Sequence, residues 1–129
     1  MIDRSVGINI GGEARKIKFT IQAIEELEAM LGYSVFDLMQ KGRWSVTETI
    51  KAVYCGLKVY DRKLRYSTVE EWVSDYAQVV DEGMTDLYAR CVACIGLSGL
   101  VGGQRSAFED ILTSLEEQEE ASAGAEGKL

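Results

Sequence analysis

Residues 19–34, FTIQAIEELEAMLGYS, give the clearest helix signal in the chain. At 100° per residue their apolar side chains fall within about 120° of one another, which predicts a stripe packed on a core. The stripe consists of Ala23, Ile24, Leu27, Met30 and Leu31. The remaining circumference carries Gln22, Glu25, Glu26 and Glu28. This acidic face fits either a solvated surface or a docking surface for a basic partner. We expect Thr20 to cap the helix and Gly32 to end it.

The segment before this helix reads as a β-hairpin. Apolar residues alternate along residues 6–10 and again along residues 16–20, and Gly11-Gly12 lies between the two runs. Two such runs around a glycine pair predict paired strands with a tight turn. A lone hairpin is marginal in water, so it must pack on the helices or pair with another copy at an edge.

The rest of the chain carries further helix signals. Ser34 begins a short helix, whereas Ser45 with Glu48 and Ser67 with Glu70 read as capping boxes of two longer ones. Gly56, inside the first of these, indicates either a close approach by a neighbouring helix or a functional kink. The fold class we expect is mainly α, with an N-terminal β-hairpin followed by a compact bundle of about five to six helices.

The C-terminal part has a different composition. Residues 96–103, GLSGLVGG, read as a hinge, and Ser106 with Glu109 predict the start of a final short helix. The apolar face of that helix contains the candidate partner-binding residues Phe108, Ile111, Leu112 and Leu115. This face can pack on its own domain, on another copy or on a client. We therefore expect a hairpin plus helical-bundle domain over 1–100, the hinge and final helix over 101–116, and a disordered acidic tail over 117–129.

Composition excludes several classes of partner. The 129 residues suggest one domain, and a net charge of −7 argues against nucleic acid or anionic membrane as the main partner. No apolar run reaches the length of a membrane span, the start MIDRSVGINI has no apolar core of the kind a signal peptide carries, and an odd number of cysteines implies no disulfide framework. These features predict a cytoplasmic protein.

No set of residues indicates catalysis, a metal or a cofactor. Cys91 and Cys94 have motif-like spacing, but with only Cys55 besides them and no histidine in the chain a zinc site lacks ligands. We expect all three cysteines to act as small buried hydrophobes. Ser34 lacks the Asp-Ser-Leu context of an acyl carrier protein, and the basic segment 61–66, DRKLRY, reads as a solvated turn. The sequence therefore predicts a protein that is not an enzyme.

The order of these elements resembles the small tail-assembly chaperones of long-tailed phages, in the group shared with gene transfer agents. Members open with a short β-segment and glycine turn, and continue with a helix of the form A-I-x-x-L-E-x-x-L-G-x-S. They then place a Gly-Leu pair near the end of a middle helix. The matching residues are Ala23, Ile24, Leu27, Glu28, Leu31, Gly32 and Ser34, followed by Gly56 and Leu57. The resemblance covers roughly residues 5–100 and leaves out the last helix and the tail.

The resemblance implies a protein that binds the tape-measure protein during tail assembly, keeps it soluble and helps to recruit tail-tube subunits. It also implies a location in the host cytoplasm, absence from the finished virion, and a chaperone that acts in many copies. Several members make a longer, frameshifted form. The alternative from another class is a regulatory or adaptor protein of a mobile element that acts through Glu25, Glu26 and Glu28 as a DNA mimic.

Overall fold

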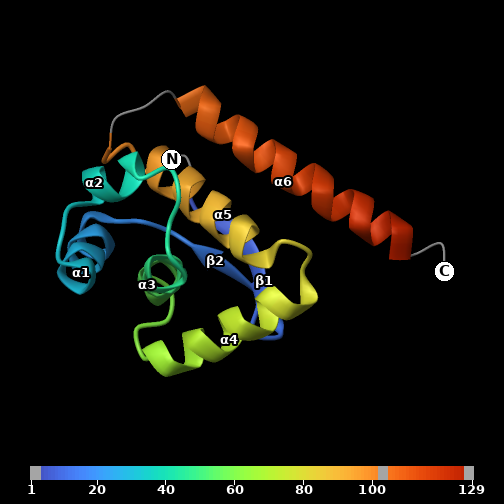
Figure 1. Ribbon diagram of the computed structural model, residues 1–129, viewed down its shortest axis with the longest axis horizontal. Helices are drawn as coiled ribbons and strands as arrows, with labels where there is room; N and C mark the ends of the chain where they lie inside the picture. The colour runs from blue at the N-terminus through green and yellow to red at the C-terminus, as the bar shows by residue number, and fades with distance from the viewer. Residues whose placement is uncertain (1–3, 102–104, 127–129) are drawn as a thin grey trace.

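The computed structural model describes residues 4–101 and 105–126, and it confirms a mainly helical fold that opens with a β-hairpin (Figure 1). The described elements are, in chain order, β1 (Val6–Ile10), β2 (Glu13–Ile17), α1 (Ile21–Leu31), α2 (Val35–Gln40), α3 (Val46–Lys58), α4 (Tyr66–Val79), α5 (Gly83–Leu97) and α6 (Arg105–Glu126).

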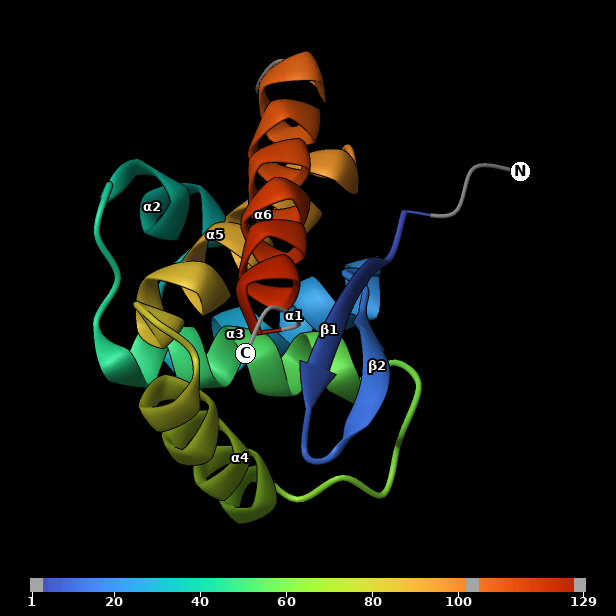
Figure 2. The same cartoon turned by 90° about the vertical axis from the view of Figure 1, so that its right-hand side faces the viewer.

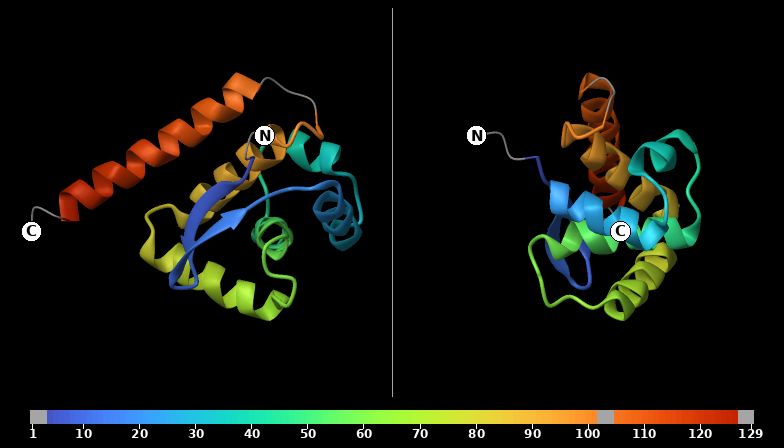
Figure 3. Two further views of the ribbon diagram at one scale, coloured as in Figure 1. Left: turned by 180° about the vertical axis from the view of Figure 1, so that it is seen from behind. Right: turned by 90° about the vertical axis from the view of Figure 1, so that its left-hand side faces the viewer.

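The hairpin forms as the glycine pair predicts. The strands are antiparallel, with Ile10 opposite Glu13, and Gly11 and Gly12 both have positive φ, at 65° and 79°. Gly11 also lies against the Trp72 ring of α4, where a Cβ would come within 2.5 Å of a ring carbon. The turn therefore needs glycine for its backbone and for its contact with α4. Figure 3 (left) shows the hairpin crossing the bundle with its turn beside α4.

Helix α3 is the centre of the bundle. It packs against α1, α4, α5 and strand β2, and Figure 1 shows it end-on among them. Ile17 occupies the space beside Gly56, where a Cβ would overlap its side chain, and the Lys18 amide donates a 3.2 Å hydrogen bond to the Gly56 carbonyl. The predicted close approach at Gly56 is therefore made by the hairpin rather than by a helix.

The predicted caps of the first three helices are present. Thr20 accepts from the Ala23 amide at 3.1 Å, and Gly32 has a left-handed φ of 83°. Ser34 caps α2, and Ser45 forms the predicted capping box with Glu48 at the start of α3. These caps satisfy backbone donors that the first helical turn leaves without partners.

The prediction of a capping box at Ser67 and Glu70 is wrong. Helix α4 begins at Tyr66, after an extended Arg65 that makes no side-chain cap, so Ser67 lies inside the first turn. Packing, rather than a side-chain cap, determines where α4 begins. Leu64 is buried just before the helix, and the Tyr66 ring stacks edge-on against Tyr54 of α3, with ring centroids 5.5 Å apart.

The last two helices are longer than the sequence indicated. Helix α5 continues through Gly96 to Leu97, so the predicted hinge is reduced to a turn at 98–100, and residues 102–104 lie outside the described residues. Helix α6 spans Arg105–Glu126, and in the stretch predicted to be a disordered tail, 117–129, only Glu117 has a described side chain. The side chain of Ser106 and residues 127–129 lie outside the described residues.

Candidate functional site

The four predicted partner-binding residues lie on the side of α6 that faces its own domain. Leu115 is buried, at 7% exposed, and Leu112 packs against the main core, whereas Phe108 and Ile111 are partly buried. Helix α6 lies along α5 in Figure 1, and its C-terminal end extends past the bundle in Figures 1 and 3. In the described chain this face is therefore occupied by the domain itself.

Gly96 is where α6 meets α5 most closely. A Cβ on Gly96 would overlap the ring of Phe108. Ala93 and Ala89 stand one and two turns before Gly96 on the same side of α5, and Ala93 has no exposed surface. We call the surface formed by these three small residues, together with the neighbouring hairpin, the α5 groove. Small side chains allow α6 to approach the α5 backbone and place an aromatic ring against it.

A cavity of about 420 Å³ remains between α6 and the hairpin. Leu112 and Glu116 line it from α6, and Arg90 lines it from α5. The hairpin side includes Arg15 and Lys16. Figure 2 shows α6 beside β1, the arrangement that leaves this space between them. The cavity wall is therefore basic on the domain side and carries a glutamate on the helix side.

Arg90 joins the groove to the core through a buried polar cluster. The Arg90 side chain is 5% exposed. Its Nε donates to Asp86 at 2.7 Å, and a guanidinium nitrogen donates to the Gly7 carbonyl at 2.9 Å. The Tyr76 hydroxyl also donates to Asp86, at 2.6 Å. Burial and this hydrogen bond raise the pKa of Tyr76, so the phenol keeps its proton. The cluster fixes β1 against α5 and α4. The only sign of this polar cluster in the sequence is the spacing of Asp86 and Arg90, which lie four residues apart.

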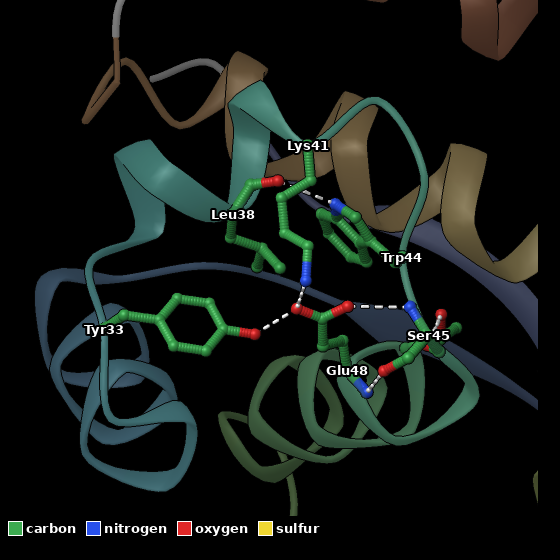
Figure 4. A network of polar contacts seen from close by, with 7 residues as sticks. Tyr33, Leu38, Lys41, Trp44, Ser45 and Glu48 are labelled. Atoms are coloured by element: carbon green, nitrogen blue, oxygen red, sulfur yellow. Dashed lines mark hydrogen bonds and ion pairs between the residues drawn. The ribbon is translucent and has the colours of Figure 1, made fainter.

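Glu48 organises a second polar network, at the junction of α1, α2 and α3 (Figure 4). One carboxylate oxygen accepts from the Ser45 amide at 2.7 Å. The other accepts from Lys41 Nζ at 2.6 Å and from the Tyr33 hydroxyl. The nearby Trp44 indole donates to the Leu38 carbonyl at 3.0 Å. The sequence identified Glu48 only as a capping residue and missed its contacts with Tyr33 and Lys41.

The Glu48 carboxylate stays ionised at neutral pH. Burial raises its pKa, but the hydrogen bonds from Lys41, Ser45 and Tyr33 outweigh burial and lower the pKa to about 2. A general base needs a pKa closer to the working pH and access to a substrate. Because its hydrogen bonds with Tyr33, Lys41 and Ser45 join neighbouring segments of the fold, Glu48 acts as a structural junction.

The three cysteines are buried free thiols. Burial raises the pKa of Cys55 to about 12 and raises that of Cys91 well above its usual value. Cys94 lies 3.3 Å from the Ile17 carbonyl oxygen and donates its weak hydrogen bond there. The expectation of small buried hydrophobes is confirmed, and Cys94 additionally contacts the end of β2. Among the described residues, no group of histidine, cysteine, aspartate or glutamate could hold a metal ion.

The acidic face of α1 is partly engaged in the fold. Glu28 accepts from the Val35 amide at the start of α2 at 2.8 Å, and Glu26 pairs with Lys58 of α3 at 2.7 Å. Glu25 is exposed. Two of the three glutamates therefore have local structural partners, which weakens the hypothesis of a DNA-mimicking surface.

A groove of about 340 Å³ lies on the outer side of β2, toward the α3–α4 loop. Leu57, Leu64 and Trp72 supply apolar lining. The Arg15 guanidinium stacks on Trp72, 4.1 Å from the ring centroid, and also donates from Nε to the Ile10 carbonyl. These contacts hold the hairpin turn on α4. Arg62, Lys63 and Arg65 of the basic turn are exposed, as predicted.

No helix among the described residues is both long and apolar enough to cross a membrane. No family model, curated protein or solved structure matches this chain.

Proposed function

We propose that this protein is a phage tail-assembly chaperone, a non-enzymatic protein that binds the tape-measure protein and aids assembly of the tail tube. Its place of action is the host cytoplasm, and it leaves before the virion is complete. Working in many copies, it would cover a long client and hand over to tail-tube subunits. The resemblance over residues 5–100 suggests this role.

The observation that best supports the proposal is the way α6 packs in the α5 groove. The α5 groove holds an amphipathic helix, with the ring of Phe108 over Gly96 and Leu115 buried. A long helical client exposes apolar faces of the same kind before the tail tube encloses it, and recognition of such faces by a groove is a common binding mode. An acidic exterior, net −7, would keep the resulting complex soluble.

Co-expression with the tape-measure protein of the same phage or prophage, the client that the proposal assigns, tests the proposal. We expect the tape-measure protein to become soluble and to co-purify with the chain. The control is co-expression with an unrelated acidic helical protein of similar size, which should leave the client insoluble. Equal solubility with both proteins, or no co-purification, would contradict the proposal.

A further inference from the structure

Helix α6 packs along α5, but few of its described side chains are fully buried. Among residues 107–117, the part of α6 whose side chains the structure describes, Leu115 alone is buried, whereas α5 buries eight of its 15 residues. Beyond Leu115 the helix has no further large apolar residue. Buried apolar area provides most of the free energy that holds a helix in place, so the described part of α6 contributes less of this free energy than α5 does.

The α5 groove selects for a particular helix. Because Gly96 has no side chain, the groove accepts an aromatic ring at one position along the docked helix. Two turns farther along the docked helix, Glu116 lines the cavity whose other wall includes Arg15, Lys16 and Arg90. A helix with an aromatic residue and an acidic residue eight positions later therefore matches both features.

The cavity of about 420 Å³ runs along the two strands, and Leu112 and Glu116 of α6 form one of its walls. A larger apolar side chain in place of Leu112 would extend into part of this space. A better-filling helix would bury more apolar area than α6 does and would compete with it.

We infer that a partner's amphipathic helix replaces α6 in the α5 groove, placing an aromatic side chain on Gly96 and acidic side chains toward the hairpin. This inference rests on the proposed function and assigns the client site: α6 occupies the groove until a client helix displaces it. A tethered helix competes at a high effective concentration, so α6 keeps weak or wrong helices out.

The test uses a fluorescein-labelled peptide of residues 105–126 as the probe and the full-length chain as the receptor. Phe108→Ala in the full-length chain weakens the binding of its own α6 to the groove. The peptide should therefore bind this variant about tenfold more tightly than it binds the wild-type chain. Thr113→Ala, at an exposed position of α6, is the matched control and should leave peptide affinity unchanged. Near-ultraviolet circular dichroism checks that each variant keeps its fold.

A second comparison tests the contact between the aromatic ring and Gly96. In the Phe108→Ala chain, the wild-type peptide should bind about tenfold more tightly than a peptide carrying Phe108→Ala. When the receptor carries both Gly96→Ala and Phe108→Ala, the preference for the wild-type peptide should disappear. The new Cβ at position 96 occupies the space that the phenylalanine ring of the peptide requires.

The inference is overturned if Phe108→Ala leaves peptide affinity unchanged, or if the preference for the aromatic peptide survives Gly96→Ala. Exchange of α6 between two copies, seen by light scattering as a dimer that excess peptide does not dissociate, would also overturn it. The assay contains no tape-measure protein. Peptide capture without client solubilisation would therefore count against the proposed function alone.

Discussion

The side chain of Ile17 fills the space that a Cβ on Gly56 would require, so strand β2 lies directly on the backbone of α3. The adjacent hydrogen bond from the Lys18 amide to the Gly56 carbonyl fixes the same approach, at 3.2 Å. Gly56 is therefore the position where the hairpin becomes part of the bundle core.

Gly56→Ala should destabilise the protein by about 2 kcal/mol, because overpacking at Ile17 exceeds the helix propensity that alanine adds. Urea unfolding followed by circular dichroism measures the change. Ala29→Gly, at an exposed position of α1, gives the size of the propensity effect alone, about 1 kcal/mol. A Gly56→Ala variant more stable than the wild type would contradict the close approach.

Glu48 makes stability depend on pH. Its folded pKa of about 2 lies below the usual 4.5, so its stabilising contribution is complete above pH 4.5 and is lost as the pH falls toward 2. Glu48→Gln should cost about 2 kcal/mol at pH 7 and much less at pH 3. Urea midpoints at the two pH values measure this difference.

Glu71→Gln, at an exposed position of α4, is the control for Glu48 and should change stability little at either pH. A loss of stability for Glu48→Gln that is the same at pH 3 as at pH 7 would show that the ionised carboxylate is not the stabilising group.

The cysteines should be unreactive in the folded protein. Burial holds the pKa of Cys55 near 12 and that of Cys91 well above its usual value, and thiolate is the reactive form. A colorimetric disulfide reagent at pH 8 should label none of the three thiols until urea unfolds the chain. Ser74→Cys places a thiol on the surface of α4 and should react at once. A native cysteine that reacts as fast as this introduced thiol would contradict the buried arrangement.

Two glutamates of the acidic face should differ in their effects on stability. Glu28→Ala removes the acceptor for the Val35 amide and should cost about 1 kcal/mol, whereas Glu25→Ala should be nearly neutral. Thermal unfolding of both variants measures the contrast. Equal stability of the two variants would contradict the contact between Glu28 and the Val35 amide. A DNA-mimicking surface predicts, in addition, reduced partner binding in both variants.

The sequence predicted the features whose signals are local. The glycine turn and the caps at Thr20, Ser34 and Ser45 depend on residues within a few positions of one another, so they could be predicted without the fold. The start of α4 could not, because the burial of Leu64 and the contact of Tyr66 with Tyr54 replace a cap there.

The sites proved harder to predict because their residues are distant in the chain. Glu48 meets Tyr33 and Lys41, and Arg90 reaches Gly7, 83 positions away. Periodicity identifies the apolar face of α6, but it does not say what covers that face. Only the fold shows that Phe108 lies on Gly96.

The packing of the first strands on later helices has a consequence for synthesis on the ribosome. Arg4 donates to the Ser98 carbonyl at 2.9 Å, and Cys94 donates to the carbonyl at the end of β2. The hairpin is translated first. Because of these contacts, it reaches its final position only after α5 has emerged from the ribosome. Helix α6 follows later still, so a nascent chain presents an open α5 groove.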